Sequence, residues 1–294
     1  MAEPTRRTEQ PRCVKRTASP SAYTRLVYWR ASPSERAVAS VVNPDAVVVE
    51  GPGYTGPVRR GDVIRAVVFD AGNTLVRMNY VTISRELATH GVRATPAEVQ
   101  RAEWQARVRL DTEVFARAPG ASTESRSSGA HYARLILEAL GVSDASVVEA
   151  VVEWRRGYNA PRGLFDVADP VAEPALRLVR DRGLTAGVVS NSNGTIRSIL
   201  QALGLLPYLA FVLDSAEVGV EKPDPRIFRL AVEQARVAPR EAVYVGDLYS
   251  VDVRGARAAG LDAILLDPAG LWGARDCRKA PDVLAAVRLI LDAC

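Results

Sequence analysis

The sequence predicts an α/β protein built on a doubly wound parallel sheet. From Val63 onward, five short apolar runs recur between helix-like stretches; in chain order they are VIRAVVF, LTAGVV, LAFVL, AVYVG and DAILL. These runs are apolar throughout and rich in β-branched residues, as expected of strands covered on both faces. Because they alternate with helical periods, we expect a parallel sheet with helices on either side.

Residues 1–62 do not share this pattern. They contain 7 Pro and 4 Gly, and they hold 10 Lys or Arg against 6 Asp or Glu, whereas residues 63–294 are balanced at 28 against 28. We therefore predict a disordered N-terminal extension, and one hypothesis is that translation begins at Val63. Since the net charge of +4 comes entirely from this extension, the folded part has no charge surplus to suggest nucleic-acid binding.

A long stretch without a strand signal separates the first apolar run from the second. Thr95-Pro96-Ala97-Glu98 has the form of a capping box and opens a helix. Other helical periods cover residues 80–90, 128–140 and 144–157. We predict an inserted helical cap domain over residues 79–165 and an α/β core made of residues 63–78 and 166–294. A last helical period, over residues 281–293, closes the core.

The composition narrows the chemistry. The chain has 3 Cys, which are far apart, and 2 His, so a disulfide framework, a thiolate metal site and a histidine-rich metal site are not indicated. If the protein is an enzyme, we expect carboxylates to do the chemistry. No apolar run is long enough to cross a membrane and no signal peptide is apparent, which predicts a cytoplasmic location without membrane contact. The sequence leaves open a monomer or a homodimer.

Polar side chains follow the apolar runs directly. Asp70 ends the first run, Ser190 and Asn191 end the second, and Asp247 ends the AVYVG run, with Asp252 five residues later. In an open parallel sheet, ligands bind at the carboxyl ends of the strands. Each of these residues alone is also typical of a turn or a helix cap. Their common position at strand ends predicts a shared site.

Lys222 is unusual in this chain, because the sequence has only 3 Lys among 38 cationic residues. It lies in the segment Glu221-Lys222-Pro223-Asp224-Pro225, ahead of a predicted helix. A single lysine in a loop is typically a solvated charge. Together with the strand-end residues, it indicates a site for an anionic substrate.

In order and spacing, these segments resemble the motifs of the haloacid-dehalogenase-like hydrolase superfamily, in the branch with a helical cap after the first strand. VVFDAGNTL resembles the nucleophile motif, VVSNSN the second motif, EKPDPRIF the lysine motif and VGDLYSVD the acidic motif. The resemblance implies Asp70 as nucleophile, with Lys222 as its catalytic partner. It implies a small phosphorylated substrate and a Mg²⁺ cofactor. The implied metal ligands are Asp70, Gly72, Asp247 and Asp252, and the implied substrate-binding residues are Ser190, Asn191, Lys222 and Thr74.

One position departs from the family pattern. Phosphatases of this family usually carry a second Asp two residues after the nucleophile as general acid, and this chain has Gly72 there. A general acid typically contributes ~10²- to 10⁴-fold to the rate. Either the leaving group needs no proton, as in an acyl phosphate, or the cap supplies an acid, with Glu103, Asp111 or Glu113 as candidates.

The missing acid keeps other functions open. Dehalogenases of the family also lack the second Asp, but they use no metal, whereas Asp247 and Asp252 match the Mg²⁺-dependent members. A catalytically silent phosphate-binding protein is the alternative outside the enzymes. Phosphonate cleavage needs a lysine in the cap, and none occurs between Lys15 and Lys222. The sequence thus favours a Mg²⁺-dependent phosphatase that acts through an aspartyl-phosphate. A 2-haloacid dehalogenase is the alternative hypothesis among enzymes.

Overall fold

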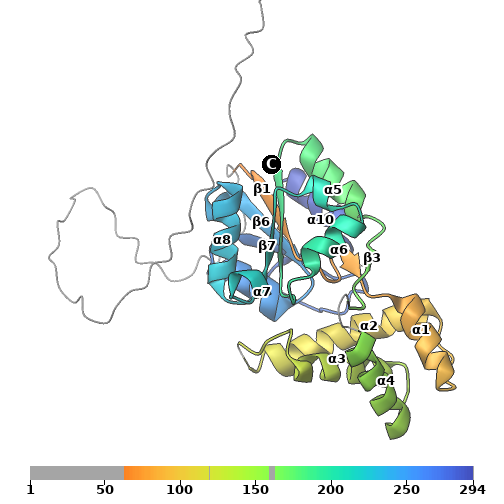
Figure 1. The fold of residues 1–294 in the computed structure, drawn as a ribbon. Coiled ribbons are helices and arrows are strands. Elements are labelled where there is room, and N and C mark those ends of the chain that lie inside the picture. The colour runs from red at the N-terminus through yellow and green to blue at the C-terminus, as the bar shows by residue number, and fades with distance from the viewer. Residues whose placement is uncertain (1–62, 119, 159–162, 294) are drawn as a thin grey trace, which may run out of the picture. The chain divides into compact units, whose positions relative to one another are not determined.

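Six strands form one parallel sheet in the order β5-β4-β1-β6-β7-β8 (Figure 1). The computed structural model describes residues 63–118, 120–158 and 163–293, so the predicted N-terminal extension lies outside the described residues. The five strand pairings are all parallel, which confirms the predicted fold class. The strands are β1 (Ala66–Phe69), β4 (Thr185–Ser190), β5 (Phe211–Asp214), β6 (Ala242–Gly246), β7 (Asp262–Leu266) and β8 (Arg278–Ala280).

Helices cover both faces of the sheet. Alternate residues of β1 point to opposite faces, so Val67 and Phe69 belong to one buried cluster and Ala66 and Val68 to the other. The first cluster includes helices α5 (Ala172–Asp181), α6 (Ile196–Ala202) and α10 (Val283–Leu291). The second includes α8 (Pro225–Ala235) and α9 (Arg254–Ala258), and a single turn, α7 (Ser215–Val218), follows β5. Burial on both faces explains why the five strands that the sequence predicts are mainly apolar.

Each of the five apolar runs forms a strand of the sheet, and the helix expected over residues 281–293 is α10. Three short strands have no such signal. β8 has the sequence RKA and lies at the edge of the sheet, where Lys279 pairs with Asp267. β2 (Val76–Arg77) and β3 (Val167–Ala168) have two residues each and pair antiparallel. Strands this short or this polar carry no period that a sequence can display.

The ribbon of β2 and β3 is where the chain leaves the sheet and returns to it. Between these strands lie α1 (Tyr80–Thr89), α2 (Pro96–Leu110), a π-helical turn η1 (Asp111–Phe115), α3 (Arg126–Ala139) and α4 (Ala145–Tyr158). We call this segment the helical insertion (Figure 1). An ion pair of 2.6 Å between Arg77 and Asp169 supports the ribbon. The cap and core boundaries at residues 79 and 165 stay a prediction.

Helix α2 of the insertion begins at the capping box that the sequence predicts. At α2, the Thr95 hydroxyl accepts from the Glu98 amide and the Glu98 carboxylate accepts from the Thr95 amide, as the capping box predicts. The insertion has its own apolar cluster, which includes Leu87, Ile136 and Val151. Val251 of the sheet domain also belongs to that cluster. The insertion is therefore packed against the loop that carries the acidic motif.

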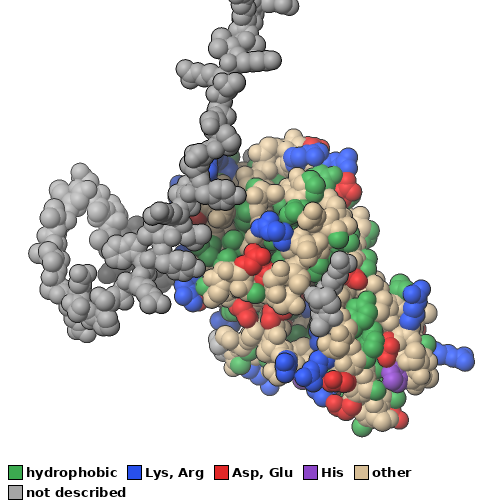
Figure 2. All heavy atoms as spheres, viewed as in Figure 1, with side chains coloured by type: hydrophobic (Ala, Val, Ile, Leu, Met, Phe, Trp, Pro, Cys, Tyr) green, Lys and Arg blue, Asp and Glu red, His purple; other side chains and the backbone are tan. Residues whose placement is uncertain are grey.

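The described surface carries both basic and acidic side chains (Figure 2). On the face shown in Figure 2, basic and acidic side chains are intermixed, and they form no continuous basic stripe over the described residues there. Within those residues, the structure has no helix with the length and apolarity needed to cross a bilayer.

Candidate active site

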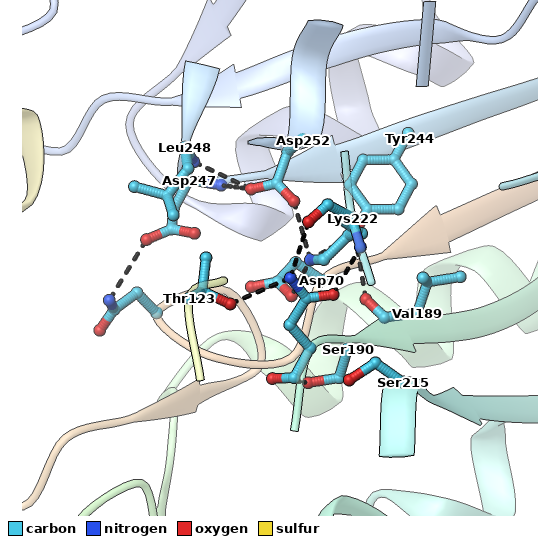
Figure 3. Close-up of polar contacts among 12 residues, drawn as sticks. Asp70, Thr123, Val189, Ser190, Ser215, Lys222, Tyr244, Asp247, Leu248 and Asp252 are labelled. Atoms are coloured by element: carbon cyan, nitrogen blue, oxygen red, sulfur yellow. Dashed lines mark hydrogen bonds and ion pairs between the residues drawn. The ribbon is translucent and has the colours of Figure 1, made fainter. Parts of the chain in front are cut away.

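Three predicted aspartates meet at the carboxyl edge of the sheet (Figure 3). Asp70 directly follows β1, and Asp247 directly follows its neighbour β6, so the sheet places them side by side. Asp252 comes from η4 (Tyr249–Val253), the π-helical turn after β6. All three are buried, and one carboxylate oxygen of each lies within 4.8 Å of the others. The sequence motifs thus form one cluster.

Lys222 joins two of these carboxylates. Its Nζ lies 2.5 Å from Oδ1 of Asp70 and 2.8 Å from Oδ1 of Asp252, and it also donates to the Tyr244 hydroxyl at 3.0 Å. Burial lowers the pKa of Lys222, but Asp252 and Asp70 outweigh burial and keep that pKa well above its usual value. Lys222 is therefore a fixed, buried positive charge beside the predicted nucleophile.

Asp252 is held from both sides. Its Oδ1 accepts from Lys222, and its Oδ2 accepts from the backbone amides of Asp247 at 3.0 Å and Leu248 at 2.9 Å. Gly246 makes this approach possible, because a Cβ there would lie 2.5 Å from the Asp252 carboxyl carbon. Asp252 thus orients the loop that carries Asp247, in addition to its place in the acidic cluster.

The second motif supports Lys222 directly. The side chain of Asn191 accepts from the Lys222 amide at 2.7 Å and donates to the Lys222 carbonyl at 2.9 Å. It also donates to the Thr123 hydroxyl of the helical insertion at 3.0 Å. Ser190 is buried at the end of β4 and lines the same cavity. The Asn191 amide side chain is thereby occupied by protein contacts, and the Ser190 hydroxyl donates to the Asn191 carbonyl at 3.3 Å.

Thr74 is not brought to the same cavity. Its side chain is buried, its hydroxyl has no hydrogen-bond partner among the described residues, and it lines a separate small cavity beside Arg77 and Trp104. Gly72, in contrast, lines the main cavity beside Asp70. The structure therefore gathers every predicted site residue except Thr74 in one place.

A buried ionic network lies behind Asp247. Glu103 of α2 accepts two hydrogen bonds from Arg107, at 2.9 and 2.8 Å, and Arg107 Nε lies 3.4 Å from Asp247. Tyr132 of α3 donates to Glu103 at 2.5 Å, and Asn73 donates to Asp247 at 3.2 Å. In the sequence, Glu103 is marked only as a candidate acid, and Arg107 and Tyr132 have no strand-end position or motif that connects them to Asp247.

The cluster holds more negative charge than its protein partners offset. Burial raises the pKa of Asp70 to about 6, although Lys222 partly counteracts it. Burial also raises the pKa of Asp247 well above its usual value, against the opposing effect of Arg107. Carboxylate oxygens that crowd together with raised pKa values suit a hard divalent cation. Asp70, Asp247 and Asp252 therefore fit Mg²⁺ as ligands, and Gly72 lines the same cavity.

A cavity of about 210 Å³ opens over Asp70, enough for a small molecule. Its walls come from the strand-end loops and from the helical insertion, which contributes Phe115, Glu124 and Arg155. The described residues that line this cavity do not include the three candidate acids, Glu103, Asp111 and Glu113. Glu103 is tied to Arg107, Asp111 to Ser250, and Glu113 to Arg109. None of the three predicted candidates replaces the missing acid in this arrangement.

Comparisons with known proteins identify a family and several relatives of this chain. A family model described as haloacid dehalogenase-like hydrolase matches residues 64–260. The chain is 31% identical over 217 residues to haloacid dehalogenase-like hydrolase domain-containing protein 3 of Bos taurus, covering 70% of this chain and 85% of that protein. It is 28% identical to a glyceraldehyde 3-phosphate phosphatase of Methanopyrus kandleri, covering 68% and 82%.

Among solved structures, the Bacillus subtilis protein YfnB, crystallised with magnesium, has the same fold. It matches with a TM-score of 0.55 at 16% identity, over 78% of this chain and 99% of that one. The family model covers more than half of the chain, and the strand-end aspartates and the buried lysine lie within the matched residues. The chain therefore belongs to the haloacid dehalogenase-like hydrolase family and is a hydrolase.

Proposed function

We propose that this hydrolase is a Mg²⁺-dependent phosphatase that acts on a small phosphorylated metabolite through Asp70. The observation that carries the proposal is the convergence of Asp70, Lys222 and Asp247 on one cavity. The phosphatase relative from Methanopyrus kandleri supports the same reaction class. We retain the cytoplasm as the proposed location, on the sequence grounds given above.

In the proposed reaction, a carboxylate oxygen of Asp70 attacks phosphorus. The bond between phosphorus and the leaving group breaks, and its electron pair departs on the leaving oxygen. Water then attacks the same phosphorus, which restores the Asp70 carboxylate and releases phosphate and a proton. Lys222 offsets charge on the phosphoryl oxygens, and the Ser190 hydroxyl, which otherwise donates to the Asn191 carbonyl at 3.3 Å, donates a hydrogen bond to them.

Asp70, Asp247 and Asp252 would hold Mg²⁺ together with the Gly72 carbonyl. Bound there, Mg²⁺ would neutralise charge on the phosphoryl oxygens. The three carboxylates otherwise repel an incoming anion, and Lys222 offsets only part of their charge. The proposed reaction therefore depends on the cation even though the nucleophile is a protein side chain.

The position of Gly72 sets the substrate preference. It lies beside Asp70 and has no side chain to protonate a leaving oxygen. We therefore propose acyl phosphates or activated aryl phosphates as better substrates than alkyl phosphates, because carboxylate and phenolate leave without a proton.

The test is phosphate release from acetyl phosphate and p-nitrophenyl phosphate, with Mg²⁺ and with a chelator. We expect release that requires Mg²⁺ and that Asp70→Asn abolishes. Asp181→Asn, which removes an exposed carboxylate at the end of α5, is the control and should leave the rate unchanged.

Two results would contradict the proposal. Halide release from a 2-haloacid, unaffected by the chelator, would identify a dehalogenase instead. Binding of vanadate or phosphate without turnover of any substrate in a metabolite-phosphate panel would identify a silent binding protein.

A further inference from the structure

A charged side chain of the helical insertion lines the cavity and forms no ion pair with the described residues. Arg155 lies near the end of α4, and its Nη1 donates to the Gly129 carbonyl of α3 at 2.7 Å. Two other cationic side chains among the described residues line the cavity, and both are neutralised. Lys222 is paired with Asp70 and Asp252, and Arg107 with Glu103 and Asp247. Arg155 has no ion pair within 4.0 Å in the described part of the chain.

The charge of Arg155 is maintained in a partly desolvated position. Burial lowers its pKa, and Tyr132 and Glu124 counteract that effect in part. An arginine nevertheless stays protonated in proteins at any ordinary pH. Glu124 also lines the cavity, but it forms no ion pair with Arg155 in the described residues, and burial raises its own pKa to about 7. The cavity thus contains a guanidinium that Glu124 compensates only in part.

Gly129 fixes where that guanidinium lies. A Cβ on residue 129 would approach Arg155 Nη1 to 2.7 Å, closer than real Cβ contacts. A side chain at residue 129 would displace the guanidinium from its present contact with the backbone carbonyl of α3. The contact uses a single N–H, and a guanidinium has five N–H donors in a rigid fork. Within the described residues the other donors have no hydrogen-bond partner, so the guanidinium can offer them to a ligand that enters the cavity.

We propose, building on the phosphatase function above, that Arg155 binds a second anionic group of the substrate, a carboxylate or a second phosphate. Asp70, Lys222 and Ser190 bind the phosphoryl end at the sheet edge, and Arg155 binds the other end from the helical insertion. A guanidinium suits this task because its fork matches the oxygens of a carboxylate or a phosphate. The substrate class is therefore a small phosphorylated acid or a bisphosphate.

Non-hydrolysable ligands test this independently of turnover. Calorimetry on the full chain at a fixed concentration of free Mg²⁺ would compare three series of equal chain length: alkylphosphonates, ω-carboxyalkylphosphonates and α,ω-alkylene bisphosphonates. We expect at least one member with a second anion to bind about tenfold tighter than its alkyl counterpart, the gain of one charge-assisted contact. The carboxylate and bisphosphonate series distinguish the two sources of the anion.

Variants of Arg155 and its neighbours assign the effect. Arg155→Met should remove the preference for a second anion and leave alkylphosphonate binding unchanged. Gly129→Ala should weaken the same preference by displacing the guanidinium, without changing any charge. Arg156→Met is the matched control, since Arg156 is exposed and pairs with Glu153 outside the cavity.

The outcomes separate the two proposals. If alkylphosphonates bind and no second anion improves binding, the Arg155 inference is wrong and the phosphatase function stands. A preference that persists in Arg155→Met would also overturn the inference. If no phosphonate binds to the unaltered protein, the phosphoryl site itself is wrong, and both proposals fall.

Discussion

Lys222 Nζ lies 2.5 Å from Oδ1 of Asp70, the residue whose carboxylate is proposed to attack phosphorus. The same ammonium group contacts Oδ1 of Asp252, and Oδ2 of Asp252 accepts from the backbone amide of Asp247 (Figure 3). One lysine therefore links the nucleophile to the acidic loop. It balances part of a buried negative cluster before any ligand enters.

The first prediction concerns Lys222→Met. Loss of the charge leaves Asp70 and Asp252 without their common partner, so we expect a loss of about 3 kcal/mol in the free energy of unfolding of the metal-free protein. Phosphate release should fall by about 10²-fold or more, as when one fixed donor to a transition state is removed. Urea denaturation with and without Mg²⁺, and initial rates, measure both effects.

The second described lysine supplies the control. Lys279 pairs with Asp267 at 2.7 Å near the sheet edge, away from the cavity, and is partly exposed. Lys279→Met should leave phosphate release unchanged and cost about 1 kcal/mol or less. Equal rate losses in the two variants would contradict a special role for Lys222.

A second prediction follows from the space around Gly72. A Cβ at this position would lie 3.6 Å from the Phe165 ring and 4.0 Å from Asp70 Oδ2, which are ordinary contact distances. Gly72→Asp can therefore be accommodated and would place a carboxyl next to the nucleophile. We expect the rate on alkyl phosphates to rise by about tenfold or more, while the rate on acetyl phosphate changes little.

Gly72→Asn has nearly the same shape but cannot donate a carboxyl proton, so it should not rescue alkyl phosphates. Initial rates on matched alkyl and acyl phosphates would decide the matter. A similar gain on both substrates, or a gain with asparagine, would show that proton transfer to the leaving group does not limit the rate.

The buried ion pair of α2 leads to a third prediction. Glu103 is fully buried and accepts from Arg107, Tyr80 and Tyr132. Glu103→Gln removes the charge that compensates Arg107, which then acts on Asp247 alone. We expect a destabilisation of about 3 kcal/mol and weaker Mg²⁺ binding, because the freed guanidinium competes for the Asp247 carboxylate.

Mg²⁺ titration by calorimetry and urea denaturation measure these effects. Glu113→Gln is the matched control, since Glu113 forms the same kind of i,i+4 pair with Arg109 on the exposed face of the insertion. Its substitution should change the free energy of unfolding by less than about 1 kcal/mol. An unchanged Mg²⁺ affinity in Glu103→Gln would contradict the coupling between Arg107 and Asp247.

The sheet and its strand-end residues were predictable because each leaves a local signal. A strand buried on both faces must be apolar, so a polar residue such as Asp70 or Asp247 marks the point where the strand ends. Parallel connections between the strands then place those ends at one edge of the sheet. The two-residue ribbon β2 and β3 has no such period and was missed.

The part of the site contributed by the helical insertion was not predictable in this way. Whether Glu103, Tyr132 or Arg155 reaches the cavity depends on how α2, α3 and α4 pack together, and helical periods fix a buried face without fixing its neighbour. Tyr132 has no strand-end position or motif in the sequence, yet it lines the cavity and donates to Glu103. Gly129 gave one weak signal, as a glycine inside a helix.

The last prediction concerns Asp111, which joins the insertion to the acidic loop. It accepts from the Ser250 amide at 2.8 Å and from the Ser250 hydroxyl at 2.9 Å, two residues before Asp252. Burial raises the pKa of Asp111 to about 6 from an ordinary 3.8, although the Ser250 hydrogen bonds counteract this in part. The folded protein therefore holds the Asp111 proton more tightly than the unfolded chain does.

Because the folded pKa is the higher one, the contribution of Asp111 to stability is greatest below about pH 4 and falls as pH rises through about 6. Asp111→Asn keeps an oxygen to accept from the Ser250 amide but does not titrate. The stability difference between the unaltered protein and Asp111→Asn should thus shift by on the order of 2 kcal/mol, against the unaltered protein, between pH 4 and pH 7. Urea denaturation in chelator across that range, with Asp181→Asn as the control for loss of a carboxylate, measures it. A difference that stays constant with pH would mean that Asp111 titrates alike in the folded and unfolded chain, and its burial against Ser250 would then have no energetic consequence.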